Sequence, residues 1–431
     1  MATALITLGR LPKALTLARH LSAAGYRVVV AEPFKWHLAL VSRAVSRSYV
    51  TPSPNLDPSG YRACLLDIIE REEVTLVIPV SEEIHHVLPL RGDLPPQVLL
   101  FAPNWNDYLT AADKLYFAQR AQSLGLAVPT THIYGTPAAE NLGVADNCIY
   151  KPRRGCSGVG IVRDPDALPA QEQNENTVVQ TFIDGQVISS LTLVVDGSEV
   201  QTVVYQGKVF SGTVAICFEQ IQPSAAVIDW IHTWTQSFEG NGFIALDFII
   251  DPQGQPWGIE CNPRLTSGIH FFTNLDQLAA KPNQRDINQP IANVELPASE
   301  AGSDSVPNHQ PTFSMPSQSK GESTHAKTVS ATAQRPKRWQ WGYSTLTEAY
   351  GALFRGDFSQ YWQIMKLLRT SRDCVWSWRD PLPFLLMTPL SISILWPAIK
   401  EGLTLGEACQ RDIAPLWDRG SDSGVVARDM P

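Results

Sequence analysis

The sequence predicts a mixed α/β and α+β protein of several domains, and three observations carry this prediction. At 431 residues the chain exceeds one typical domain and is long enough for two or three. Strand and helix patterns alternate over residues 1–105, which is typical of a Rossmann-like parallel sheet with helices on both faces. Further along, short apolar runs separated by turn signals favour antiparallel strands. We therefore expect a parallel-sheet domain at 1–105, a small lid-like α+β unit at 106–185, an antiparallel sheet at 186–280, a disordered linker at 281–336 and a helical extension at 337–431.

The alternation in the N-terminal domain can be followed element by element. Strands are predicted at residues 5–8, 27–31 and 76–80, and helices at 14–24 and 61–71. Loops at the carboxyl ends of parallel strands commonly hold ligands, so Ser81, Glu82 and Glu83 are candidates for substrate contact. The alternative, which the sequence favours, is a solvated helix start.

The most informative segment runs from 258 to 264, with Asp247 upstream of it. Residues i and i+2 of a strand face the same side, so Glu260 and Asn262 point together while Cys261 points away. The turn signal at 251–254 predicts a hairpin that can bring Asp247 opposite that pair. These oxygen ligands suit Mg²⁺ or Mn²⁺, and Arg264 follows as a planar cation able to bind an oxyanion. The alternative is an ordinary hairpin whose polar residues face water.

A second polar segment lies at 150–161, where Lys151 ends an apolar strand and a glycine-rich turn follows. Gly155, Gly158 and Gly160, with Ser157 among them, allow backbone amides to approach phosphate oxygens closely. The turn is not a P-loop, because the lysine precedes the glycines. The alternative is a flexible hairpin turn.

Taken in order over residues 1–275, these motifs resemble the ATP-grasp superfamily. Asp113 and Lys114, followed by Gly125 and Pro129, are similar to the segment whose lysine reaches the nucleotide. The resemblance implies that the phosphates are held by Lys114, Lys151 and the loop residues Gly155, Ser157, Gly158 and Gly160. It implies that adenine and ribose are held by Gln180, Thr181, Phe182, Ile183 and Gln186. It also implies that the metal is held by Asp247, Glu260 and Asn262, and that Arg264 stabilises the transferring phosphoryl group.

Two positions depart from the family pattern, which usually has Glu where Thr181 and Gln186 stand. Backbone contacts to adenine would survive the first change. A neutral amide at 186 should bind ribose hydroxyls more weakly than a carboxylate.

The resemblance implies an ATP-dependent ligase that uses Mg²⁺ or Mn²⁺. Such an enzyme activates a carboxylate, or an enol oxygen, by phosphorylation and joins it to an amine. Within the superfamily, segments 11–36, 41–61 and 380–384 resemble the mycosporine-glycine synthetase type, which adds glycine to 4-deoxygadusol. Two alternatives stay open: an amino-acid or dipeptide ligase, and a non-catalytic nucleotide-binding module.

Composition limits the partners. A net charge of −8 argues against an extended nucleic-acid surface and favours small-molecule substrates. Seven scattered cysteines without a Cys-x-x-Cys pair favour reduced thiols in a cytoplasmic protein. The oligomeric state stays open.

The C-terminal region recovers large apolar residues after the polar stretch at 281–336. Residues 381–399 contain no charge, which raises a membrane span, but four prolines interrupt them. We expect two short docked helices, and peripheral membrane contact through 381–399 stays open.

Overall fold

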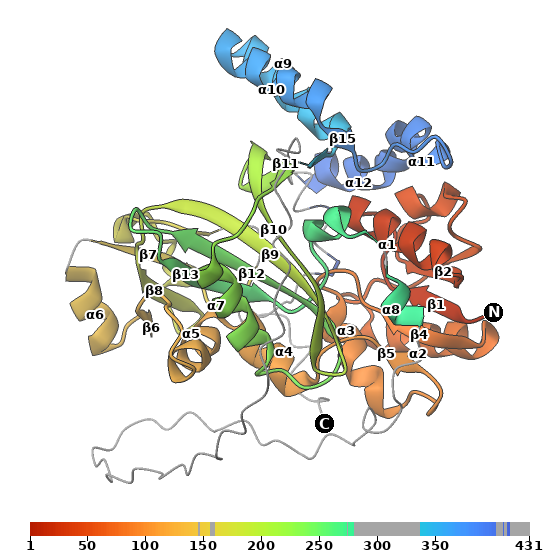
Figure 1. The fold of residues 1–431 in the computed structure, drawn as a ribbon, viewed down its shortest axis with the longest axis horizontal. Coiled ribbons are helices and arrows are strands. Elements are labelled where there is room, and N and C mark those ends of the chain that lie inside the picture. The colour runs from red at the N-terminus through yellow and green to blue at the C-terminus, as the bar shows by residue number, and fades with distance from the viewer. Residues whose placement is uncertain are drawn as a thin grey trace, which may run out of the picture.

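The computed structural model describes residues 1–144, 147–155, 160–273, 275–279 and 337–401, together with 408, 412 and 413. Three sheets and their helices form the body of the molecule, and helices of the C-terminal extension lie along one edge of it (Figure 1). The expected linker at 281–336 lies outside the described residues.

The N-terminal domain is a five-stranded parallel sheet, as predicted. Its strands are β1 (Thr3–Ile6), β2 (Arg27–Glu32), β3 (Arg47–Val50), β4 (Val74–Ile78) and β5 (Leu99–Leu100), in the order β3-β2-β1-β4-β5. The helices of this domain are α1 (Pro12–Ala23), α2 (Pro58–Arg71) and the short α3 (Ile84–Val87). Proline at the first position of α1 and α2 has no helical N–H bond to lose, so both helices start there.

A small α+β unit follows. It contains α4 (Trp105–Ala112), α5 (Lys114–Ser123) and α6 (Pro137–Val144), and a three-stranded antiparallel sheet. The strands are β6 (Thr131–Ile133), β7 (Cys148–Pro152) and β8 (Thr177–Thr181), in the order β6-β8-β7.

The largest sheet has seven strands. Five of them come from the central region: β9 (Gln186–Val195), β10 (Ser198–Ser211), β11 (Val214–Gln220), β12 (Gly242–Ile250) and β13 (Pro256–Asn262), with α7 (Ala225–Thr235) between β11 and β12. The other two, β14 (Arg338–Gln340) and β15 (Arg372–Asp373), come from the extension, and β14 pairs with β11. The extension is therefore helical with two strands that complete this sheet.

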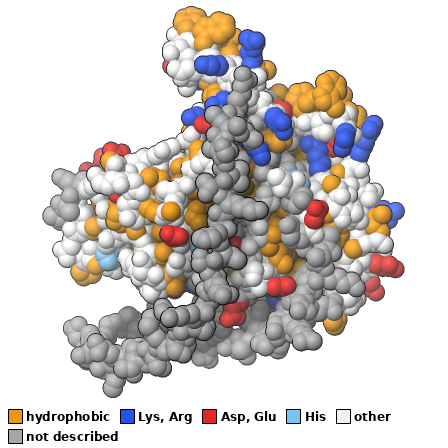
Figure 2. Space-filling view, in the orientation of Figure 1, with side chains coloured by type: hydrophobic (Ala, Val, Ile, Leu, Met, Phe, Trp, Pro, Cys, Tyr) orange, Lys and Arg blue, Asp and Glu red, His pale blue; other side chains and the backbone are white. Residues whose placement is uncertain are grey.

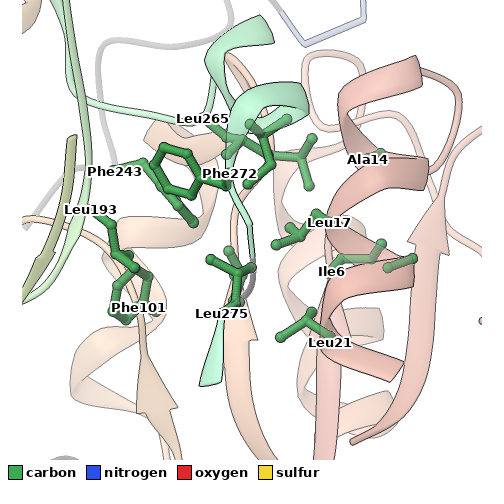
Figure 3. Close-up of a cluster of buried hydrophobic side chains, with 14 of the residues drawn as sticks. Ile6, Ala14, Leu17, Leu21, Phe101, Leu193, Phe243, Leu265, Phe272 and Leu275 are labelled. Atoms are coloured by element: carbon green, nitrogen blue, oxygen red, sulfur yellow. The ribbon is translucent and has the colours of Figure 1, made fainter. Parts of the chain in front are cut away.

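The core explains how the N-terminal domain and the large sheet are held together. Ile6, Leu17 and Leu21 of the N-terminal domain share one buried cluster with Leu193 and Phe243 of the large sheet (Figure 3). The neighbouring residues on the same strands, such as Val194 and Ile244, point to the other face of the sheet and pack with α7. One face of the large sheet thus meets the N-terminal domain and the other meets α7. The remaining short elements are the 3₁₀ turns Leu38–Val41, Leu88–Gly92, Pro165–Ala167, Ala170–Glu172 and Ser267–Phe271, and the helix α8 (Asp276–Ala279).

The extension contains α9 (Gly342–Phe354), α10 (Phe358–Thr370), α11 (Leu382–Leu385) and α12 (Met387–Glu401). Two helices do follow residue 381, as expected, although α12 continues through Pro389 and Pro397 rather than stopping. Pro389 lies in its first turn, where the missing N–H has no helical partner. Among the described residues, no helix combines the length and apolar character that crossing a membrane requires.

Candidate active site

The hairpin of β12 and β13 brings together the carboxylates that the sequence singled out. Asp247 pairs directly with Glu260 in the register of the two strands. The Asn262 side-chain nitrogen lies 3.3 Å from Asp247 Oδ2 and 3.1 Å from Glu260 Oε1. Ser189 on the neighbouring strand donates to Asp247 Oδ1 at 2.5 Å. Alternation along each strand, with the predicted hairpin, thus produces a cluster of oxygen atoms on one face of the sheet.

The two carboxylates do not share one electrostatic environment. Burial, together with the facing charge of Glu260, raises the pKa of Asp247 to about 7. Burial alone would raise the pKa of Glu260 too, but Lys114 and Lys151, together with Asn262 and Arg264, lower it below its usual value. Two anions held this close need positive charge, which explains why both lysines lie near Glu260.

Lys114 and Lys151 reach the carboxylates from the small α+β unit. Lys114, the first residue of α5, lies 3.6 Å from Glu260 Oε2 and donates to the Gly155 carbonyl at 3.0 Å. Lys151 on β7 is buried and donates to the Ile259 carbonyl at 3.3 Å. Burial and the neighbouring Lys114 lower the pKa of Lys151 to about 7, and the carboxylates offset this only in part.

Asp113 organises the start of the glycine-rich turn. It caps α5 by accepting from the backbone of Leu115 and Tyr116. Its buried carboxylate also pairs with Arg153 at 2.7 Å and Arg154 at 3.0 Å. The two arginines are therefore anchored on the small unit. The sequence identified Asp113 only by its place beside Lys114, and this clamp was not foreseen.

The glycine-rich turn itself is described only at its ends. Gly155 and Gly160 have φ values of 135° and 76°, which favour glycine. A Cβ on Gly160 would lie 2.9 Å from a Pro152 side-chain atom, so the chain approaches itself closely there. Ser157 and Gly158 lie outside the described residues.

Arg264 connects the carboxylates to the N-terminal domain. It donates to Asn262 Oδ1 at 3.0 Å and forms an ion pair with Glu82. Lys13, near the start of α1, donates to Ser81 Oγ at 3.1 Å and to the Leu265 carbonyl at 3.0 Å. The loop after β4 thus faces the antiparallel sheet.

Residues 81–83 do lead into a helix, α3, but the expectation that this helix start is solvated is wrong. All three are buried, and Glu83 accepts from the Thr7 hydroxyl at 2.9 Å and from the Val80 backbone at 2.7 Å. Glu82 is covered because this loop faces the segment that carries Arg264, whereas the partners of Glu83 lie within the N-terminal domain itself.

Comparison with known proteins identifies the arrangement. Residues 111–268 match the family model described as the ATP-grasp domain. This part of the chain is similar to the ATP-grasp domain family. The predicted ATP-grasp architecture is confirmed, and the family match supports the prediction of an ATP-dependent ligase.

Solved structures resemble part of this chain at low identity. Biotin carboxylase from Campylobacter jejuni, in a β-γ-ATP complex, has a TM-score of 0.52 and 15% identity, covering 67% of this chain and 74% of that one. L-amino acid ligase from Bacillus licheniformis has a TM-score of 0.49 and 16% identity, covering 62% and 69%. The biotin carboxylase structure, at 15% identity, shows a likeness of fold alone. No curated protein significantly matches this sequence.

The residues of the expected adenine hinge make several internal hydrogen bonds. Gln180 is buried and its side chain donates to Thr131 Oγ1 at 2.8 Å. The backbone N–H groups of Thr181 and Phe182 already donate to the carbonyls of Thr130 and Asn147, both at 2.9 Å. A contact of this hinge with adenine would have to use other backbone groups, such as those of the neighbouring Ile183.

Gln186 is not brought to the carboxylates. The register between β9 and β12 is continuous, and Ser189 faces Asp247, so Val187 shares that face while Gln186 points to the other. There Gln186 donates to Gln206 Oε1 at 2.5 Å. The residue of this strand that shares the face of Ser189 is Val187, two positions earlier. Its side chain has no polar atom to bind a ribose hydroxyl.

A divalent cation fits the carboxylate pair of the ATP-grasp domain. Burial and the facing charge of Glu260 both raise the pKa of Asp247, and a cation between the two acids would stabilise their charged forms. Asn262 at present directs its nitrogen toward both acids, so its amide must exchange nitrogen and oxygen to act as a ligand. The described residues contain no group of three or more His, Cys, Asp and Glu side chains suited to a metal. The remaining ligands would have to come from the nucleotide or water.

Proposed function

We propose that this protein is an ATP-dependent ligase that phosphorylates a carboxylate, or an enol oxygen, and joins the activated group to an amine. The observation that carries the proposal is the convergence of Asp247 and Glu260 with Lys114, Lys151 and Arg264. Two acids suit a divalent cation, and three cations suit phosphate and acyl-phosphate oxygens. No nucleophilic side chain is needed for this chemistry.

Each group has a role that follows from its position. Asp247 and Glu260, with Asn262, would hold Mg²⁺ or Mn²⁺, which neutralises negative charge on the phosphates when bound. Lys114 and Lys151 would hold the phosphates, since both extend from the small unit that carries the glycine-rich turn. Arg264 would stabilise charge that develops on the transferring phosphoryl group.

The substrate class follows from the groups beside Arg264. Lys13 and Arg264 supply positive charge for an acidic substrate, and Glu82 supplies negative charge for an amine. Positive and negative side chains that lie together where two domains meet suit a reaction between an acid and an amine. Glycine with 4-deoxygadusol is the first pair to test, because of the sequence resemblance, and pairs of amino acids are the second.

The test is ADP release from ATP and Mg²⁺ in mixtures of acids and amines. The proposal expects release that requires both members of one pair. Glu260→Gln and Asp247→Asn should each lower kcat at least about a hundredfold, which corresponds to about 3 kcal/mol of transition-state stabilisation. Asp229→Asn is the matched control, because Asp229 is an exposed acid on α7, on the other face of the same sheet.

Two outcomes would contradict the proposal. Retention of a tenth or more of the rate in Glu260→Gln or Asp247→Asn would remove the metal role from these acids. ATP binding by calorimetry, without ADP release from any pair, would favour the non-catalytic nucleotide-binding module. Thermal melting of each variant separates a lost site from a lost fold.

A further inference from the structure

The exposed hydrophobic side chains of this protein are concentrated in its C-terminal extension. Of the 25 large hydrophobic residues that are exposed in the described part of the chain, 14 lie between residues 337 and 401. Those 65 positions are a small share of the described residues, so the concentration is not the ordinary scatter of apolar side chains over a surface.

The first group lies on the helical hairpin of α9 and α10. Tyr343, Leu346, Tyr350 and Phe354 recur at helical spacing along α9, and all four are exposed. The opposite side of α9 buries Ala349 and Ala352, and Ala349 packs with Val209 and Ile216 of the large sheet. One face of the helix therefore holds the extension on the body, and the other presents an apolar stripe to solvent.

The second group lies around α11 and α12. Trp378 is 86% exposed, although its ring lies 5.0 Å from that of Trp376, which in turn packs against Phe384. Trp396 and Ile399 at the end of α12 are 69% and 76% exposed. Figure 2 shows both groups along the same edge of the molecule, one at the projecting tip and one beside it.

Positive charge accompanies these groups. Residues 337–401 contain eight Lys and Arg against five Asp and Glu, although the whole chain has a net charge of −8. Seven of the eight basic residues are exposed, whereas Asp357 is the one acid of this segment described as exposed. Lys and Arg side chains lie close to both hydrophobic groups in Figure 2. The edge therefore has a charge opposite to that of the rest of the protein.

We propose that this edge, formed by the extension, is a docking surface for an anionic lipid membrane. Tryptophan and tyrosine favour the membrane–water interface, and flanking Lys and Arg are attracted to anionic headgroups. A peripheral contact, with α9, α10 and α12 lying in the interface, suits short amphipathic helices that do not cross the bilayer. The acidic body would be repelled from the same surface, so the charge distribution also sets the orientation.

A second copy of this chain is a poorer occupant of the surface. A symmetric contact places the same patch of both copies face to face, so the exposed cations of one copy would meet those of the other. An anionic bilayer neutralises these charges and accepts the apolar side chains together.

The test is flotation of the full-length protein with vesicles of phosphatidylcholine, with and without phosphatidylglycerol. The protein is expected to float with the anionic vesicles, more weakly with phosphatidylcholine alone, and less as NaCl is raised. Trp378→Ala and Trp396→Ala should each lower the partition coefficient about tenfold, because each removes a large exposed ring. Lys366→Gln combined with Arg369→Gln should lower it about tenfold or more for the anionic vesicles only.

Trp36→Ala is the matched control. Trp36 is 52% exposed and has the Lys35 ammonium 5.7 Å from its ring, yet it lies outside the extension. Flotation of this variant should equal that of the unmodified protein. The proposal is overturned if the protein does not float with anionic vesicles at low salt, or if Trp36→Ala lowers flotation as much as Trp378→Ala. A dimer that Trp378→Ala dissociates, without any flotation, would instead assign the surface to a second copy.

Discussion

Replacing Asp412 with Asn should destabilise the protein strongly, although this residue has no role in the proposed chemistry. Asp412 accepts two hydrogen bonds from the Arg10 guanidinium, at 2.7 and 2.8 Å. Arg10 is fully buried and also pairs with the fully buried Glu32 at 2.6 Å. Glu32 in turn accepts from the backbone of Gly9 and Arg10. The side-chain carboxylate of Asp412, from the C-terminal part of the chain, thus completes a buried network just beyond β1 and β2.

The magnitude follows from the burial of this network. Removing one member of a buried ion pair costs about 3–5 kcal/mol, because the remaining charge is left poorly compensated. Glu32 still neutralises Arg10 in the variant, so we expect the lower end, about 3 kcal/mol. With about 2–4 °C per kcal/mol for a domain of this size, Tm should fall by about 6–12 °C. Thermal denaturation and urea unfolding of the full chain measure both quantities.

The control is Asp67→Asn, which makes the same chemical change in an exposed pair. Asp67 and Arg71 lie 3.1 Å apart with more than half of each side chain exposed, so the change should cost no more than about 0.5 kcal/mol. A double-mutant cycle with Arg10→Gln isolates the coupling between Arg10 and Asp412. A coupling below about 0.5 kcal/mol, or equal losses in Asp412→Asn and Asp67→Asn, would refute this reasoning.

Three further outcomes are expected. Gly258→Ala should lower the free energy of unfolding by about 1–3 kcal/mol in urea, because its Cβ would lie 2.4 Å from the Trp230 ring; Gly92→Ala, with no atom nearby, should be nearly neutral. Burial lowers the pKa of His270 to about 3. The free energy of unfolding should therefore fall as the pH drops from about 6.5 towards 3, by up to about 1.4 kcal/mol per pH unit. Measured in unfolding experiments at several pH values, His270→Gln should reduce that slope. A protein ending at residue 280 keeps Lys114, Lys151, Asp247 and Glu260, so calorimetry should still detect ATP binding, whereas its Tm should fall because β11 loses β14.

The parts of this structure that the sequence predicted depend on local patterns. Alternating apolar runs identified the parallel sheet, and the turn at 251–254 correctly placed Asp247 opposite Glu260. Both inferences need only the periodicity of neighbouring residues. Lys114 and Lys151 were found through motif order, and the structure brings both of them near Glu260.

The features that the sequence did not predict depend on contacts between distant segments, or on a shift of one residue along a strand. The pairing of β14 with β11 joins segments separated by more than a hundred residues, and no local signal in residues 338–340 indicates it. Glu82 is buried where it pairs with Arg264 of another domain, and Glu83 where it accepts from Thr7 and Val80 of its own domain. Both contacts join residues distant in the sequence or depend on tertiary packing, so the local pattern looks the same as that of a solvated helix start. Gln186 differs from Val187 by one residue, and one residue is enough to exchange the two faces of a strand.

The charges of the proposed active site suggest how nucleotide and metal binding depend on each other. In the described structure Lys114 compensates Glu260, and Lys151 also lowers the pKa of that acid. Phosphate oxygens that attract both lysines would remove this compensation and leave two facing acids in need of a cation. A cation held by the acids would, in turn, attract phosphates to the same place. Each ligand should therefore strengthen the binding of the other, and by thermodynamic linkage the two effects must be equal. This reciprocity follows from Lys114, Lys151, Asp247 and Glu260 alone and does not depend on the identity of the proposed acid and amine substrates.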